Sequence, residues 1–258
     1  MPPQHQAYQG RGRPSHAPGN RHQQQMAQYI GSGGGTYHPP GGQAKYFSID
    51  VECVATGTDH NARSVGQISL VDEFERVLLN IYVKPDAPVE SYLSPLTGLS
   101  SDVLDRHGVP LPVALQCLRS YLPPYAVLVG QSIGKDVGWL SLREGSDFES
   151  MIDLAGLFRI WNSTYNSVSI FSLDHLAKVL LGYGNGGGPH NAVGDALKSM
   201  QLFNYYRQVH NAPGVWKSVE AALLAAPVDE SFAKKYPCFE GVCMGNRKKC
   251  TCGAPFFG

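Results

Sequence analysis

The first 49 residues of this 258-residue sequence contain no acidic residue, although they carry four basic ones, Arg11, Arg13, Arg21 and Lys45. The remainder therefore holds 17 Lys and Arg against 21 Asp and Glu, a formal charge of −4. An acidic body that handles a polyanion needs cations, metal ions among them, to offset its carboxylates. The charge total by itself neither supports nor excludes a nucleic-acid partner.

Long hydrophobic runs are also missing. No apolar stretch approaches the length of a membrane span, and the N-terminal residues lack the apolar segment of a signal peptide. We therefore expect an intracellular protein, in the nucleus or cytoplasm, that is not secreted and does not bind a membrane. Cysteine is sparse, at 6 residues, and inside a cell these are expected as free thiols or metal ligands rather than disulfides.

Residues 1–43 are rich in Gln, Gly, Pro and His. Such a composition buries too little apolar surface to offset the entropy of ordering the chain. The segment is therefore predicted to be a disordered tail that acts as a solvated tether. The alternative is that its "RGR" run, with scattered Tyr and His, gives the tail a weak affinity for RNA.

Strand and helix patterns begin at Lys45. Three strand-like runs, 45–54, 65–72 and 75–85, are separated by a polar loop and a tight turn, which predicts three antiparallel strands. Helices and strands then alternate, and the run 125–130 is the fully apolar kind of a buried parallel strand. Further helices are predicted at 99–108, 110–122, 135–144, 172–182, 190–211 and 215–226, and a further strand at 148–154. Ser100 or Ser101 is the predicted N-cap of the first of these helices and Gly108 its end, and Ser172 and Gly182 are the predicted cap and end of the helix at 172–182.

This order of elements predicts an α/β fold with a mixed central sheet, three antiparallel strands plus parallel ones, flanked by helices. The folded domain is predicted at residues 44–212. Residues 213–258 form a C-terminal helix and a Cys-rich tail in this prediction.

Two acids lie inside the first predicted strand. Asp50 and Glu52 are two positions apart, so they project from one face with Cα atoms roughly 6–7 Å apart. Two like charges beside a core are unfavourable unless a cation neutralises them. The alternative interpretation is an ordinary solvated strand end.

Three later residues extend this pattern. Asp136 opens a helix after the apolar strand, and Asp195 lies one turn plus one residue after His190, at the entrance of the longest helix. Taken singly, Asp136 has as its commoner role that of a helix N-terminal acid, His190 is also consistent with a satisfied core or loop histidine, and Asp195 with a partner of Lys198. Taken jointly and in this order, the residues predict one cleft.

Four carboxylates that converge favour a pair of divalent cations. Mg²⁺ and Mn²⁺ prefer carboxylate oxygen and water, so an all-acid set indicates those ions and not zinc. Two such ions about 4 Å apart activate a water molecule and stabilise the leaving oxygen of a phosphodiester. A nearby His can take the proton from that water.

The residues resemble the DEDD superfamily of 3′-to-5′ exonucleases, in its His-containing branch. The shared pattern is D-x-E in the first strand, G-x5-D after an apolar strand and H-x4-D opening a helix. The resemblance runs from about Tyr46 to Val209. Within the branch the chain is most similar to the RNA exonuclease four-like group, on the segments "IDVECV", "YVKP", "LTGL" and "SLDHLAKVLLG".

The resemblance implies a ribonuclease H-like fold, an exonuclease domain at 44–212, and residue roles. Asp50 would bridge two Mg²⁺ or Mn²⁺ ions, Glu52 and Asp195 would hold the hydrolytic ion, and Asp136 would support the second through water. His190 would be the general base.

The second motif departs from the family pattern in two places. It begins "GQ" where relatives often have "GH", so Gln131 replaces a histidine. Gly134 and Lys135 stand where Asn or another polar residue is common. Neither departure affects a metal ligand of the family; both concern substrate contacts.

Aromatic residues give a weaker signal. Phe203, Tyr205 and Tyr206 in "FNYYRQ" would stack on bases or, as is commoner for a helical aromatic stripe, pack in the core. Trp139 and Trp161 are predicted to serve in packing.

Four cysteines lie close together near the C-terminus, with the spacing C-x4-C-x6-C-x-C: Cys238, Cys243, Cys250 and Cys252. Such a group inside a cell suggests a small structural zinc site. The last pair is tighter than the usual two-residue gap, so labile or locally disordered thiols remain the alternative.

Together these features predict a metal-dependent 3′-to-5′ exonuclease that hydrolyses single-stranded RNA rather than DNA and releases nucleoside 5′-monophosphates. Two alternatives stay open. One is a DNA-directed exonuclease of the same superfamily. The other is a non-catalytic nucleic-acid-binding scaffold with the same fold, which would be expected to have lost a metal ligand, whereas all four acids are present.

Overall fold

The computed structural model describes residues 43–184 and 188–255. Residues 1–42, nearly all of the predicted tail, lie outside the described part, so that prediction stays a prediction. Within the described ranges, no helix combines the length and the apolar character needed to cross a bilayer.

A mixed sheet forms the centre of the fold, as predicted. Among the described residues it has six strands in the order β4-β3-β2-β1-β5-β6. The antiparallel pairs are β1 with β2 and β2 with β3, and the parallel pairs are β1 with β5, β5 with β6 and β3 with β4. The strands are β1 Tyr46–Ala55, β2 Arg63–Asp72, β3 Val77–Lys84, β4 Val109–Pro110, β5 Val127–Gly130 and β6 Ser150–Asp153.

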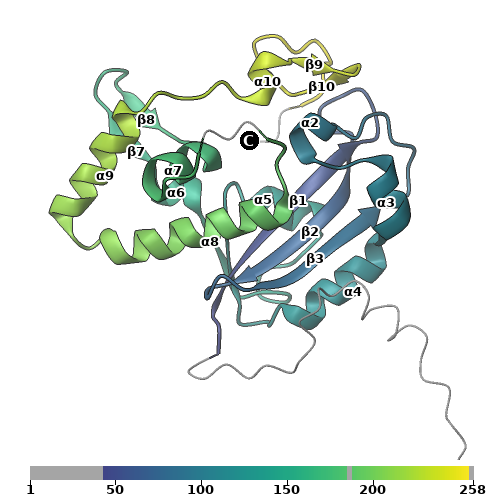
Figure 1. Ribbon diagram of the computed structural model, residues 1–258, viewed down its shortest axis with the longest axis horizontal. Coiled ribbons are helices and arrows are strands. Elements are labelled where there is room, and N and C mark those ends of the chain that lie inside the picture. The colour runs from purple at the N-terminus through teal and green to yellow at the C-terminus, as the bar shows by residue number, and fades with distance from the viewer. Residues whose placement is uncertain (1–42, 185–187, 256–258) are drawn as a thin grey trace, which may run out of the picture.

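Helices cover both faces of this sheet (Figure 1). The predicted N-caps hold, since Ser100 and Ser172 accept hydrogen bonds from the first turns of α3 and α7. Gly182 ends α7 in the left-handed conformation, at φ 73°. The helices are α2 Ser94–Thr97, α3 Ser101–His107, α4 Leu111–Tyr121, α5 Gly134–Trp139, α6 Leu154–Leu157, α7 Leu173–Leu181, α8 Ala192–Val209, α9 Pro213–Ala225 and α10 Phe232–Lys235.

Alternation along β1 divides the core into two layers. Phe47, Ile49, Val51 and Cys53 point to one face, where they pack with residues of α4 and of β2 and β3. Tyr46 belongs to the opposite layer, which α7, α8 and α9 complete. The even-numbered residues that follow on β1 therefore face α8. Asp50 and Glu52 are among them.

Small residues allow α8 to lie close against β1 and β2, which it contacts along its length. Ser48 and Ser69 on the strands and Ala192, Ala196 and Ser199 on the helix are all fully or almost fully buried. A close helix–sheet approach places the first turn of α8 directly beside the acids of β1.

The C-terminal segment packs against the C-terminal end of β1. It contains α10 and a short hairpin, β9 Cys238–Phe239 and β10 Val242–Cys243. Val242 packs in a small cluster with Ala55 and Leu93, and the Cys243 amide donates to the Thr58 carbonyl at 2.8 Å. Figure 1 shows this segment beside α2, at one end of the sheet.

Several local elements differ from the prediction, and two of them have the following form. The helix predicted at 135–144 ends at Trp139, because Ser141 adopts a left-handed conformation, φ 50°, that breaks the helical path. A second hairpin, β7 Ile160–Asn162 with β8 Ser167–Ser169, lies between β6 and α7 and was not predicted.

Candidate active site

Strand β1 contributes Asp50 and Glu52 to the α8 side of the sheet. Opposite Glu52 the β1–β2 register shifts: Glu52 pairs with Gln67 and Cys53 with Val65, which leaves Gly66 as the extra residue of a bulge. A Cβ on Gly66 would lie 2.5 Å from Leu99 Cδ1. A larger residue at this bulge would therefore displace the buried Leu99 side chain, and the bulge sets the direction of the strand at Glu52.

Asp136 reaches the same place from α5. This helix follows β5, the parallel neighbour of β1, so its first turn lies at the carboxyl end of that strand. At Gly130, the last residue of β5, an added Cβ would lie 2.7 Å from Ile133 Cδ1, so the Ile133 side chain packs directly against the backbone of this turn. Asp136 is 6% exposed, and the Val51 amide hydrogen-bonds to it.

His190 and Asp195 come from the entrance of α8. Asn191 caps that helix by accepting from the amides of Val193 and Gly194, which fixes Asp195 in the first turn. The His190 amide donates to the Leu96 carbonyl at 2.6 Å, so α2 holds the loop before the helix. The five predicted residues consequently line one cleft of about 250 Å³, whose walls are Asp50, Val51, Glu52, Leu96, Gln131, Ser132, Lys135, Asp136, Trp139, His190 and Asp195.

Asp195 is hydrogen-bonded through both oxygens. His190 Nδ1 lies 2.6 Å from Oδ2, and Lys198 Nζ lies 2.9 Å from Oδ1. Burial alone would raise the pKa of Asp195, but the hydrogen bonds from His190 and Lys198 outweigh it, so the pKa is lowered. The hydrogen bond to Asp195 in turn raises the pKa of His190.

A second acid, Asp174 at the start of α7, joins this network. Lys198 Nζ lies 2.8 Å from Asp174 Oδ1, and His190 Nε2 lies 3.6 Å from Asp174 Oδ2. Burial lowers the pKa of Lys198, but its hydrogen bonds to the two carboxylates reverse the shift and raise it. Asp195 therefore forms the predicted alternative ion pair with Lys198 and also lines the cleft.

The other three acids lack comparable partners. Burial, and then the charges of Asp136 and Asp195, raise the pKa of Asp50 well above its usual range. Burial likewise raises the pKa of Glu52 to about 8 and that of Asp136 to about 7. Carboxylates so arranged favour a cation between them.

The donor set fits divalent metal ions. One ligand atom each from Glu52, His190 and Asp195 lie within 4.8 Å of one another, and Asp50 and Asp136 line the same cleft. Hard carboxylate oxygens dominate, which suits Mg²⁺ or Mn²⁺.

Sequence reasoning missed two features of this site. The role of Asp174 carries no local signal, because its partner Lys198 is 24 residues away. The packing assigned to Trp139 and Trp161 was wrong, since they are 40% and 58% exposed and Trp139 borders the cleft. In contrast, Phe203 is 4% exposed and packs in the core, the commoner of its two interpretations.

The C-terminal cysteines gather differently from the prediction. The structure brings Cys243, Cys250 and Cys252 together with His60 from the β1–β2 loop. Cys238 is exposed and lies outside this group. Cys238 pairs with Cys243 across the two-stranded hairpin, but only Cys243 belongs to the group that contains His60.

Comparison with known proteins places these features in a family. A family model described as Exonuclease, RNase T, matches residues 47–203, more than half of the chain. Small RNA degrading nuclease 2 of Arabidopsis thaliana is 29% identical over 61% of the chain, and RNA exonuclease 4 of Candida glabrata is 28% identical over 64%. The alignments cover 34% and 60% of those two relatives, so the chain matches only part of their length.

Solved structures share the fold. The catalytic unit of Neurospora crassa Pan2, described as a protease and nuclease domain, superposes with a TM-score of 0.58 at 18% identity, over 74% of this chain and 31% of that one. A Saccharomyces cerevisiae Pan2 module in complex with AAGGA RNA gives 0.57 at 19% identity, over 74% and 34%. The ribonuclease H-like fold predicted from the sequence is confirmed.

Proposed function

Because the chain belongs to the RNase T exonuclease family, we propose that it is a metal-dependent 3′-to-5′ exonuclease that hydrolyses single-stranded RNA and releases nucleoside 5′-monophosphates. One observation carries the proposal above all. Four acids and a histidine, contributed by β1, α5 and the entrance of α8, line a single cleft, and their carboxylates carry more negative charge than the neighbouring side chains offset.

In this proposal Asp50, Glu52, Asp136 and Asp195 would hold two Mg²⁺ or Mn²⁺ ions. Bound there, the ions would activate the attacking water and stabilise the leaving oxygen of the phosphodiester. The raised pKa values of Asp50, Glu52 and Asp136 support this assignment, because burial, and secondarily neighbouring acids, disfavour their charged forms in the protein alone, and a bound cation would favour them.

His190 is the proposed proton acceptor. In the neutral ring, Nδ1 keeps the proton that it donates to Asp195, so Nε2 is the nitrogen that can accept one. Asp174, 3.6 Å from Nε2, would stabilise the charge that results. Lys198 holds both carboxylates in place and thereby orients the ring.

Trp139 offers a surface for the substrate beside the metal ligands. Its ring borders both the catalytic cleft and a second cavity of about 390 Å³, which is lined by residues from β2, β3 and α4. A half-exposed indole between two cavities suits stacking of an unpaired base. The proposed preference for RNA rests on the relatives, several of which are named as RNA exonucleases or RNA-degrading nucleases.

The test uses matched RNA and DNA oligonucleotides, labelled at either end, with Mg²⁺, Mn²⁺ or EDTA. We expect a stepwise ladder from 5′-labelled RNA, labelled mononucleotide from 3′-labelled RNA, slower cleavage of DNA, and no cleavage in EDTA. Asp50→Asn and Asp195→Ala should each abolish cleavage while the circular dichroism spectrum stays unchanged. Asp229→Asn, which changes an exposed acid that does not line the cleft, serves as the matched control.

Each alternative gives a different result. Faster cleavage of DNA than of RNA would identify a DNA-directed exonuclease. RNA binding without any metal-dependent cleavage would identify a scaffold. Full activity in Asp50→Asn would refute the assignment of the active site itself.

A further inference from the structure

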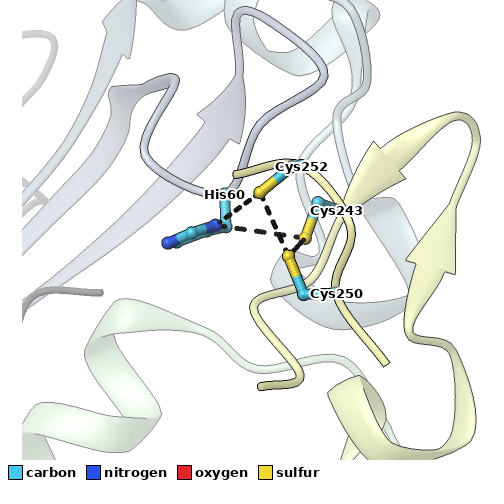
Figure 2. A group of neighbouring side chains, drawn as sticks. All are labelled: His60, Cys243, Cys250 and Cys252. Atoms are coloured by element: carbon cyan, nitrogen blue, oxygen red, sulfur yellow. Dashed lines mark hydrogen bonds between the residues drawn. The ribbon is translucent and has the colours of Figure 1, made fainter. Parts of the chain in front are cut away.

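A second group of metal-type ligands lies beyond the C-terminal end of β1. His60, in the loop between β1 and β2, faces Cys243, Cys250 and Cys252, which come from the C-terminal segment (Figure 2). One ligand atom from each residue lies within 4.8 Å of all the others. The chain brings the imidazole and the last thiol together across 192 residues.

The four ligand atoms are close enough together to share one ion, although three of their separations are shorter than those around a tetrahedral zinc ion. The Sγ atoms of Cys243 and Cys250 are 3.0 Å apart, as are those of Cys250 and Cys252. His60 Nδ1 lies 3.1 Å from Cys252 Sγ and 4.0 Å from Cys243 Sγ. Zinc bonds of about 2.3 Å to sulfur and 2.0 Å to nitrogen, at tetrahedral angles, require ligand atoms roughly 3.5–3.8 Å apart.

Neighbouring groups orient two of the four ligands. His60 Nε2 lies 3.0 Å from the Pro255 carbonyl, to which the Asn61 side-chain amide also donates at 2.8 Å. This contact keeps the proton on Nε2 and leaves Nδ1 as the metal-binding nitrogen, the arrangement common in zinc proteins. The Gly245 amide points at Cys243 Sγ, 3.4 Å away, as expected for a thiolate.

We propose that His60, Cys243, Cys250 and Cys252 form a structural zinc site. Three sulfur ligands and one imidazole select zinc over Mg²⁺ or Mn²⁺, and four protein ligands leave no position for substrate. A disulfide would account for only two of the thiols and would give no reason for the histidine to join them. The site stands apart from the proposed exonuclease chemistry and does not depend on it.

The zinc site would fasten the C-terminal segment to the framework of the cleft. Arg63 Nη2 donates to the Cys243 carbonyl at 2.9 Å, and Val242 packs against Leu93, with Leu96 at the edge of the same cluster. The Leu96 carbonyl accepts from the amide of His190. A continuous path of contacts thus leads from the zinc ligands to the histidine of the cleft.

Metal analysis of the full chain, purified without chelators, tests the proposal. We expect about one zinc per chain. His60→Ala and Cys250→Ser should each lose most of it, whereas Cys238→Ser, a cysteine of the same hairpin outside the group, should keep it. Asp50→Asn should also keep the zinc, which separates this site from the catalytic cleft.

Cobalt substitution gives a readout that does not depend on the folding of a variant. The wild-type chain loaded with Co²⁺ should show a thiolate-to-cobalt charge-transfer band and the intense visible bands of tetrahedral cobalt. Zinc-free wild-type protein with no such spectrum, a disulfide between these cysteines in non-reducing mass spectrometry, or equal zinc loss in Cys238→Ser would each overturn the proposal.

Discussion

Glu52 lowers the stability of the fold when metal ions are withheld, and this effect is measurable. Its pKa rises from an ordinary 4.5 to about 8, chiefly because the side chain is buried, and secondarily because Asp195 lies nearby. Below pH 4.5 the folded and unfolded chains both carry the protonated acid, so the residue has no net effect. As the pH rises toward 8 the unfolded chain releases its proton while the folded chain keeps it, so the unfolded state is favoured.

The size of the effect follows from the two pKa values. At pH 7 an acid with a pKa of 4.5 in the unfolded chain and about 8 in the folded one lowers the free energy of unfolding by about 3 kcal/mol. Glu52→Gln removes the titrating group but keeps its shape and a buried amide. We therefore expect the variant to be more stable than the wild type in EDTA at pH 7, by about 1–3 kcal/mol.

Urea unfolding at a series of pH values is the assay. In EDTA the gain from Glu52→Gln should be absent near pH 4 and should grow between pH 5 and pH 8. In excess Mg²⁺ the order should reverse, because the ion stabilises the wild type by binding its folded state and the variant binds it poorly. Glu144→Gln, at an exposed acid, should change neither curve. A pH-independent difference, or a loss of stability at pH 7 in EDTA, would refute the reasoning.

Two further outcomes are expected. Lys198→Met leaves two carboxylates without their shared cation, so it should lower the free energy of unfolding in EDTA by about 1–3 kcal/mol. Lys178→Met breaks an ion pair to a largely exposed acid and should change that free energy by well under 1 kcal/mol. Urea unfolding measures both variants. Trp139→Ala should raise the KM for single-stranded RNA about tenfold, which corresponds to the binding free energy of one stacked base. Trp161→Ala, at an exposed position on β7, should leave the KM unchanged. Equal effects of the two substitutions would contradict a stacking role for Trp139.

Much of the fold follows from short-range patterns. The period-two alternation in β1 predicted a strand with two acids on one face, and the serine caps and terminal glycine predicted the limits of α3 and α7. These features depend on a few neighbouring residues, so the local sequence determines them. The domain boundaries at 44 and 212 stay predictions, although the family match at 47–203 lies between them.

The shape of the cleft depended on the tertiary structure. The order of the four acids and His190 identified the candidate residues. No spacing in the sequence indicated that Lys198 would form ion pairs with both Asp174 and Asp195. That contact exists because α7 packs against α8, and the packing is decided by apolar faces rather than by the charged residues themselves. The exposure of Trp139 is likewise a consequence of where α5 ends.

By itself, then, the sequence determined the mixed character of the sheet, the limits of helices such as α3 and α7, and the identity of the acids that line the cleft. Only the tertiary structure decided the partners that come from distant segments, above all His60 beside the C-terminal cysteines in place of Cys238. The physical reason is chain connectivity. Backbone geometry fixes the relation of residues two to four positions apart, whereas the meeting of residue 60 with residue 252 requires the whole sheet, α2 and the C-terminal hairpin to pack first.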